Sequence, residues 1–218
     1  MNEPTIAVLG AGGLGGPVAM VLAQAGCRLR IVDPDVVELS NLQRQVQFTM
    51  ADLGAAKATA LAARVGGEGV VARFDATTAD AILRGADALI DGTDSPEAKF
   101  AACDAAIARG LPYVIAAALR YGGNVFSGAP GAACYRCLFE DAPSDADAPT
   151  CADAGILGPV CACVGGLAAR ALLRLTAGDL RDAGTILVVD DLRAGLRPRR
   201  VSFRPRAGCG CRAARATA

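Results

Sequence analysis

Two stretches near the start of this sequence carry the residue types and the spacing of a nucleotide site. Residues 10–16 read Gly-Ala-Gly-Gly-Leu-Gly-Gly, and residues 33–45 supply three acids, an asparagine and an arginine. A glycine turn between a strand and a helix lets backbone N–H groups and the helix N-terminus approach an anionic phosphate. Tight packing of a strand against a helix would also explain the glycines, but Asp33 at the end of the next strand favours a bound nucleotide. The pattern leaves open which nucleotide is bound.

A second set of reactive side chains consists of cysteines. The chain has nine cysteines and no histidine, which excludes His-based triads and His metal ligands. A transition metal would therefore be bound through cysteine. Cys134 and Cys137 have the Cys-x-x-Cys spacing that lets two thiolates reach one tetrahedral zinc. An odd number of cysteines, partly in close pairs, is typical of a reducing compartment rather than of a secreted disulfide framework.

The overall composition limits the class of protein. The 218 residues are 53% hydrophobic, so the chain can bury a full core. Lys and Arg number 22, as do Asp and Glu, and the net charge of zero gives no field that favours nucleic acid or an anionic membrane. No apolar run reaches the length of a membrane span, and the apolar residues 6–9 meet glycines instead of continuing as a signal core. We therefore expect a cytoplasmic protein.

Alternating strands and helices must position these residues. Strands are expected over residues 5–9, 28–32, 70–74, 88–91, 113–118 and 122–126. Helices are expected over residues 17–25, 49–65, 79–84 and 96–109. Thr49 with Asp52 resembles a capping box for the second helix, and Ser95 before Pro96 resembles an N-cap for the fourth. The alternation predicts an α/β fold with a doubly wound, mostly parallel, Rossmann-like sheet, whose ligands sit at the carboxyl ends of the strands. Asp33 and Asp94 both fall there.

The last third of the chain has a different character. Residues 140–149 form an acidic, proline-rich tract that is expected to be a mobile loop. An apolar helix over residues 158–176 should be buried, and strands over 186–190 and 200–203 should extend the sheet in antiparallel fashion. The sequence has no internal repeat and no clear boundary. We therefore expect one domain over 1–218, with a nucleotide-binding part at 1–130 and the remaining elements at 131–218.

Five motifs carry a resemblance to a known family. They are Gly10 to Gly15, residues 33–45, Gly92-Thr-Asp94, Cys134-Tyr-Arg-Cys-Leu138 and residues 150–159. In this order the sequence resembles the ThiF, MoeB and HesA family of adenylyltransferases, which are similar to ubiquitin-activating enzymes, and it is closest to ThiF. The resemblance implies ATP-dependent adenylation of the C-terminal glycine of a small ubiquitin-like sulfur-carrier protein ending in Gly-Gly. The carrier would then deliver sulfur for cofactor or specialised-metabolite biosynthesis. The resemblance also implies a homodimer and a separate protein as sulfur donor.

The same resemblance implies a site for ATP and Mg²⁺. The implied nucleotide-binding residues are Gly10, Gly12, Gly13, Gly15, Asp33, Ser40, Asn41, Gln43, Arg44, Lys57, Asp94 and Ser95. Arg44, Lys57 and Asp94 are the implied catalytic residues: the two cations hold the triphosphate, and the carboxylate holds Mg²⁺. No protein nucleophile is required, because the carboxylate of the carrier attacks. Lys57 as a solvated helix charge, Asp94 as a strand-end cap and Arg44 in a surface ion pair are the structural alternatives.

The cysteines are assigned through the same resemblance. Cys134, Cys137, Cys209 and Cys211 are implied to bind structural Zn²⁺, although the second pair is one residue closer than the Cys-x-x-Cys of the family. An empty site and oxidisable free thiols are the alternatives. Cys151 occupies the place of a cysteine with a thiol-transfer function in ThiF-like proteins, whereas MoeB-like relatives keep that cysteine without needing it. The remaining cysteines are expected in the core: Cys27, Cys103, Cys161 and Cys163.

Two departures from the family pattern leave other functions open. Only four residues precede the first strand, whereas family members carry an N-terminal arginine that reaches the ATP site of the partner subunit. Arg120 could replace that arginine; slow adenylation and a trimmed chain are the alternatives. Ser95 stands where an asparagine commonly follows the aspartate. The missing arginine leaves a non-catalytic, activating-enzyme-like binding subunit open. An NAD-dependent oxidoreductase also stays open, because it would use the same glycine turn and Asp33.

Overall fold

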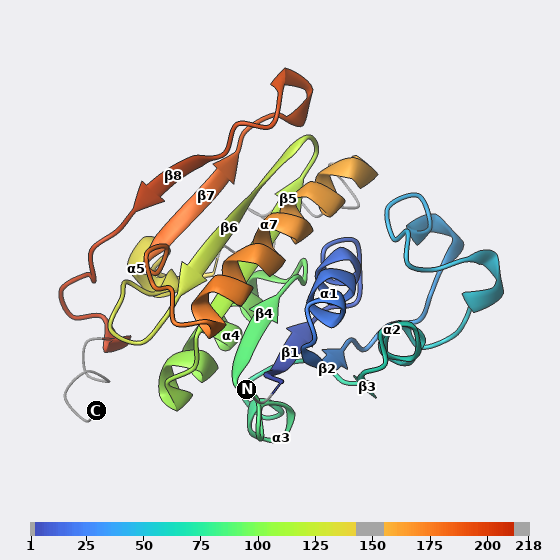
Figure 1. Cartoon of the computed structure of the whole chain (residues 1–218), viewed down its shortest axis with the longest axis horizontal. Helices are drawn as coiled ribbons and strands as arrows, with labels where there is room; N and C mark the ends of the chain where they lie inside the picture. Colours follow the sequence, from blue (N-terminus) through green and yellow to red (C-terminus); the bar gives the residue numbers. More distant parts are fainter. Residues whose placement is uncertain (1–2, 143–154, 212–218) are drawn as a thin grey trace.

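The computed structural model of the protein describes residues 3–142 and 155–211. The strands form one eight-stranded sheet in the order β3-β2-β1-β4-β5-β6-β7-β8 (Figure 1). They are β1 (Thr5–Leu9), β2 (Arg28–Val32), β3 (Glu68–Val70), β4 (Ala88–Asp91), β5 (Tyr113–Leu119), β6 (Gly122–Gly128), β7 (Thr185–Val189) and β8 (Arg199–Ser202). The first five run parallel, and β6, β7 and β8 extend the sheet in antiparallel fashion. This topology confirms the α/β fold expected from the sequence.

Helices cover both faces of the sheet. They are α1 (Gly15–Gln24), α2 (Lys57–Val65), α3 (Ala79–Ile82), α4 (Pro96–Arg109), α5 (Tyr135–Leu138) and α7 (Gly158–Thr176). Single turns of 3-10 helix are η1 (Leu39–Asn41), η2 (Met50–Asp52) and η3 (Leu192–Ala194). One core cluster contains side chains of α1, α2 and α7, and a second contains side chains of α3, α4 and α5. The sheet is therefore doubly wound.

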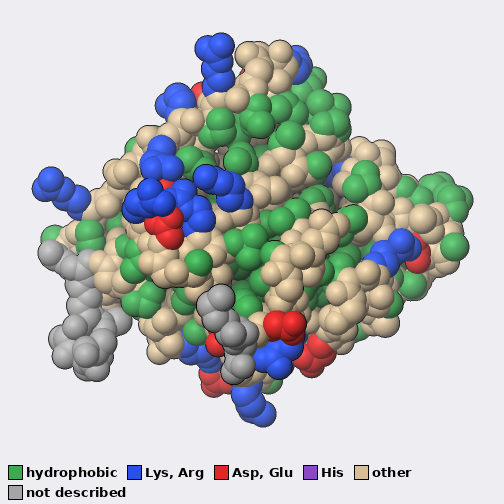
Figure 2. Space-filling model, viewed as in Figure 1, with side chains coloured by type: hydrophobic (Ala, Val, Ile, Leu, Met, Phe, Trp, Pro, Cys, Tyr) green, Lys and Arg blue, Asp and Glu red, His purple; other side chains and the backbone are tan. Residues whose placement is uncertain are grey.

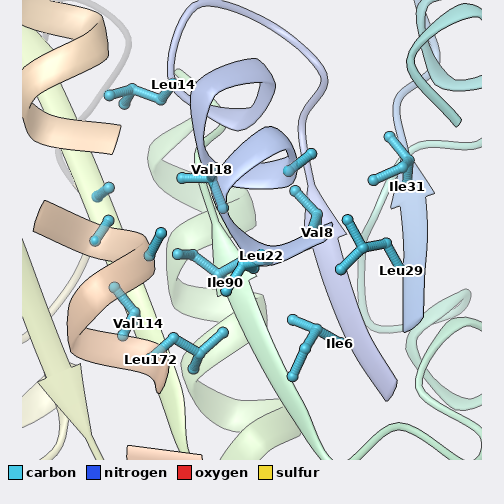
Figure 3. Close-up of a cluster of buried hydrophobic side chains, with 14 of the residues drawn as sticks. Ile6, Val8, Leu14, Val18, Leu22, Leu29, Ile31, Ile90, Val114 and Leu172 are labelled. Atoms are coloured by element: carbon cyan, nitrogen blue, oxygen red, sulfur yellow. The ribbon is translucent and has the colours of Figure 1, made fainter. Parts of the chain in front are cut away.

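The central strand β1 shows how the sequence forms these two cores. Successive side chains of a strand point to opposite faces, so a strand buried on both faces is apolar throughout. Ile6 and Val8 belong to one cluster, and Ala7 and Leu9 belong to the other. Figure 3 shows Ile6 and Val8 in the cluster that also contains Leu22 of α1. The strand ends at Leu9, and the next residue, Gly10, lines the candidate site.

Helix α7 is buried along one face rather than all round. It packs against α1, β5 and β6, and Leu172 is fully buried there (Figures 1 and 3). Pro159, Ala162 and Arg170 are exposed on the other side. By length and composition alone the 19-residue helix could cross a membrane, contrary to expectation, but half of its apolar window is buried in the fold. The core helix of a soluble protein meets the same criterion.

Two elements differ from the sequence-based expectation. The third strand was expected over residues 70–74 but spans Glu68–Val70, because pairing with the short β2 decides its bounds. The helix expected over residues 49–65 is interrupted: the Thr49–Asp52 capping box opens only η2, and Gly54 has a positive φ of 81° before α2 begins. Most other element ends agree to within two residues. The loop expected over 140–149 lies mostly outside the described residues.

Candidate active site

The glycine turn between β1 and α1 brings backbone into close contact with backbone. Gly10 has a φ of +86°, and its N–H donates to the carbonyl of Val32 at 2.8 Å. A Cβ on Gly15 would lie 1.8 Å from the carbonyl oxygen of Gly10, and one on Gly13 would lie 2.9 Å from Sγ of Cys161. These positions therefore require glycine if the turn is to keep its shape.

A cleft of about 1770 Å³ opens over the carboxyl ends of the parallel strands. Most of the nucleotide-binding residues expected from the sequence line this cleft. They are Gly10, Gly12, Gly13, Asp33, Asn41, Arg44, Lys57, Asp94 and Ser95. Gly15, Ser40 and Gln43 are not among the lining residues. The fold thus brings nine of the twelve expected residues to one opening, as the strand-end rule predicts.

Asp33 is held in place by the backbone around it. Its Oδ2 accepts from the N–H of Ala11 at 2.7 Å, and its Oδ1 accepts from the N–H of Asp35 at 2.9 Å. The side chain is only 6% exposed. Burial raises the pKa of Asp33, and the two backbone hydrogen bonds oppose that rise. The result is an oriented acceptor at the end of β2, next to the glycine turn.

Two of the four basic residues that line the cleft were expected to bind the nucleotide, and they have different environments. Lys57 is 7% exposed, and its Nζ lies 3.1 Å from Oδ2 of Asp35, so it is not the solvated helix charge considered above. Arg44 is partly exposed and donates to the carbonyl of Ser40 at 3.4 Å. Neighbouring Asn41 is buried. Within the described residues no acid pairs with Arg44, which leaves its guanidinium available to a ligand in the cleft.

Arg120 does not line the cleft of its own subunit. It occupies the β5–β6 turn with a φ of +52°, and it is not among the lining residues. Its backbone instead holds the chain after residue 154: its N–H donates to Gly155, and its carbonyl accepts from Leu157, both at 3.0 Å. Within one subunit the structure therefore gives Arg120 a backbone role. Its replacement of an arginine that reaches the site of a partner subunit stays a prediction.

Two buried glutamines, Gln45 and Gln47, lie beside the glycine turn, and neither was expected to have a role. Nε2 of Gln47 donates to the carbonyls of Ala11 and Gly12 at 2.8 and 3.0 Å. Gln45 is 3% exposed and lines the cleft, and its Oε1 has no hydrogen-bond partner among the described residues. Their place within three residues of Arg44 was the available signal. Only the fold shows that they reach back to the turn.

A buried ion pair under the cleft was also missed. Nζ of Lys99 lies 2.7 Å from Oδ2 of Asp91, and the two side chains are 8% and 0% exposed. Asp91 ends β4, and Lys99 lies in the first turns of α4. The sequence shows an acid, Asp91, just before the Gly92-Thr-Asp94 motif and a base, Lys99, shortly after it, and this could have suggested the pair. Asp94 itself is exposed at the opening.

One cluster beside α5 contains four cysteines: Cys134, Cys137, Cys209 and Cys211. Sγ distances are 3.7 Å for Cys134–Cys137, 3.5 Å for Cys134–Cys209 and 3.6 Å for Cys137–Cys211, and all four sulfurs lie within 4.8 Å of one another. Tetrahedral zinc with bonds of about 2.3 Å needs sulfurs about 3.8 Å apart. The set therefore fits zinc, and the shorter Cys209-x-Cys211 spacing does not prevent that.

The other cysteines divide between core and partly exposed positions. Cys103 and Cys161 are buried, as expected, whereas Cys27 and Cys163 are only partly buried. Cys151 lies outside the described residues.

Within the four-cysteine cluster, Cys137 has a lowered pKa. Although burial opposes ionisation, hydrogen bonds from the backbone N–H groups of Arg206 and Cys134 lower the pKa of Cys137 to about 7. This thiol is the one in the cluster most easily converted to the thiolate that a metal binds.

Comparisons with known proteins agree with this geometry. The profile of the ThiF family matches residues 1–211. The chain is 38% identical over 178 residues to the SAMP-activating enzyme E1 of Haloferax volcanii and 37% identical over 222 residues to the sulfur carrier protein adenylyltransferase of Thermus thermophilus. These matches cover 78% and 94% of the chain, and 66% and 82% of those relatives. The crystal structure of E. coli MccB with ATP superposes with a TM-score of 0.81 at 17% identity, covering 95% of the chain and 66% of MccB, which shows a shared fold.

Proposed function

The chain belongs to the ThiF family, and on that premise we propose that it adenylates the C-terminal glycine of a small ubiquitin-like sulfur carrier, using ATP and releasing pyrophosphate. The names of the two relatives, an activating enzyme and a carrier adenylyltransferase, support this reaction. The observation that carries it is the cleft, where the glycine turn meets Arg44, Lys57, Asp33 and Asp94 among other charged lining residues. That set suits a triphosphate better than a nicotinamide.

The proposed reaction is an in-line attack by the carrier's carboxylate on the α-phosphate of ATP. The attacking oxygen is already ionised at neutral pH, so the site needs no general base, in agreement with a chain that lacks histidine. Catalysis then depends on alignment and on neutralising charge. The bond between the α- and β-phosphates breaks as the acyl-adenylate forms, and pyrophosphate leaves with the electron pair.

The twelve residues expected to bind the nucleotide each have a proposed part in that alignment. Gly12 and Gly13 let the backbone approach the phosphates, and Asp33 accepts from a ribose hydroxyl. Arg44 and Lys57 neutralise the triphosphate. The remaining proposed contacts are secondary: Gly10, Gly15, Ser40, Asn41, Gln43 and Ser95. Asp94 would hold Mg²⁺, which would lower the charge of the phosphates when bound.

The cysteine cluster is proposed as a structural zinc site. The spacing of its sulfurs supports this assignment, because three of the separations are close to those of a tetrahedral set. The metal would tie the end of the described chain to α5, since Cys209 and Cys211 come from the last described residues. Cys151 is kept as a candidate for covalent sulfur transfer. A separate protein would supply the sulfur.

The exposed apolar side chains support a homodimer. Leu39, Val46 and Met50 are 62–68% exposed, and Met20 on α1 is 44% exposed. Figure 2 shows hydrophobic side chains over much of the face that carries α1 and α7. Contiguous exposed apolar surface is typical of interaction sites. We further propose one ThiF-like domain over 1–218, since strands before and after residue 130 share a sheet. We also propose a cytoplasmic location, since the eight described cysteines are free thiols.

Carrier-dependent ATP–pyrophosphate exchange tests the proposal. The probe is a purified ubiquitin-like protein ending in Gly-Gly, and its variant lacking the last glycine is the negative control. Arg44→Ala and Asp94→Ala are each expected to lower exchange about a hundredfold. Arg84→Ala, on an exposed residue outside the cleft, should leave exchange unchanged. Unchanged exchange in the first two variants would contradict the residue roles.

Two results would point to the other functions. Calorimetry that detects carrier binding without pyrophosphate release in the presence of ATP and Mg²⁺ would indicate a non-catalytic binding subunit. A fluorescence titration that detects NADH but not ATP would indicate an oxidoreductase that uses the same glycine turn.

A further inference from the structure

The ammonium group of Lys99 is fully occupied by the protein. Its three protons are donated to Oδ2 of Asp91 at 2.7 Å, to the carbonyl of Thr93 at 2.7 Å and to the carbonyl of Ala116 at 2.8 Å. These acceptors belong to the end of β4, the loop after it and β5. Lys99 thus joins α4 to two strands and to the loop beneath the cleft.

The loop is fastened from both sides. The other oxygen of Asp91 accepts from the Thr93 hydroxyl at 2.7 Å. On the far side, Oγ of Ser95 caps α4 by accepting from the N–H of Ala98 at 3.2 Å. Asp94 lies between these two anchors. Its backbone is therefore fixed by the Thr93 carbonyl on one side and by the helix cap on the other.

The Asp94 side chain has no comparable support. Among residues 3–142 and 155–211, no hydrogen bond or ion pair holds its carboxylate, which is exposed at the opening. The place of that carboxylate depends on the backbone that carries it. Groups that orient a metal-binding carboxylate commonly change metal affinity ten- to a hundredfold when they are removed.

We propose that Lys99 is a positioning residue for the Asp94 carboxylate, and that it acts by holding the carbonyl of Thr93. This inference rests on the proposed function, in which Asp94 holds Mg²⁺. Lys99 does not bind substrate itself, because its three protons are already donated within the fold. Without those bonds, the backbone before Asp94 is free to move and the carboxylate loses its alignment.

Lys99→Met tests the proposal through the dependence of exchange on Mg²⁺ concentration. The half-saturating Mg²⁺ concentration is expected to rise about ten- to a hundredfold, while KM for the carrier stays unchanged. A second measurement does not need activity: Mn²⁺ binding in the presence of a non-hydrolysable ATP analogue, followed by electron paramagnetic resonance, should weaken by a similar factor.

Two further variants separate positioning from stability. Leu172→Ala in the α7 core should lower the Tm without changing the Mg²⁺ requirement. Asp91→Asn combined with Lys99→Met leaves no unpaired buried charge, so it should recover much of the Tm that Lys99→Met loses and still need more Mg²⁺. This double variant also provides the test if the single variant does not fold.

The outcomes distinguish this inference from the proposed function. Absence of carrier-dependent exchange in the unaltered protein would overturn the proposed function, and the Mn²⁺ measurement would still decide the role of Lys99. If the double variant binds metal and exchanges at the unaltered Mg²⁺ concentration, Lys99 serves stability alone and the inference is wrong.

Discussion

Zinc binding by the cysteine cluster can be tested through its effect on unfolding. The sulfur separations of 3.5–3.7 Å are close to the tetrahedral value of about 3.8 Å, so the folded chain presents the four ligands almost in place. The unfolded chain does not, because Cys134 and Cys209 lie 75 residues apart in sequence. Zinc at a thousandfold excess over its Kd would stabilise the folded state by about 4 kcal/mol. For a chain of this length that corresponds to a rise in Tm of about 8–16 °C.

The assay is thermal unfolding of metal-stripped protein with and without zinc, together with metal content by mass spectrometry. The unaltered protein should bind one zinc and show the rise in Tm. Cys211→Ser should lose most of that rise, whereas Cys27→Ser, at a partly buried thiol outside the cluster, should keep it. A stoichiometry near zero, or the same rise in both variants, would refute the reasoning and favour free thiols.

Further predictions concern the glycine turn and the pH dependence of the site. Gly15→Ala should destabilise the fold by about 3 kcal/mol in urea unfolding and abolish ATP binding, because the new Cβ meets the Gly10 carbonyl. Gly166→Ala, at an open helical position, should instead stabilise by about 1 kcal/mol. ATP affinity, measured by calorimetry, should fall as the pH drops through the raised pKa of Asp33. The stability that Asp33 contributes changes with pH in the opposite direction to the ATP affinity. It is present below the ordinary pKa of about 4 and is lost as the pH rises through the raised pKa. Asp33→Asn should remove both pH effects.

Much of the fold could be predicted because local signals mark its boundaries. The bounds of β1 and β2 follow from apolar runs that end at glycine or aspartate, and α4 follows from Ser95 and Pro96. The third strand could not be placed, because Glu68–Val70 carries no strand signal of its own. Its position is decided by pairing with β2, and such pairing between distant segments is not encoded locally.

The candidate site was predictable to a similar extent and for a similar reason. Residues of the Asp33-to-Arg44 stretch reach the cleft because they follow strand ends, and strand ends are visible in the sequence. Gln47 and Lys99 act through hydrogen bonds to carbonyls of segments remote in the chain. Any carbonyl can accept such a bond, so residue types alone do not identify the partner.

Helix α4 connects the cleft with the cysteine cluster. Lys99 and Cys103 are four residues apart and therefore lie on one face of the helix. Cys103 contacts the Tyr113 hydroxyl at 3.3 Å, and that hydroxyl accepts from the N–H of Tyr135, which lies between two of the clustered cysteines. A displacement of α4 should therefore disturb nucleotide binding and metal binding together. Gly13 and Cys209 lie outside α4. A substitution of Gly13 should therefore disturb only nucleotide binding, and a substitution of Cys209 should disturb only metal binding.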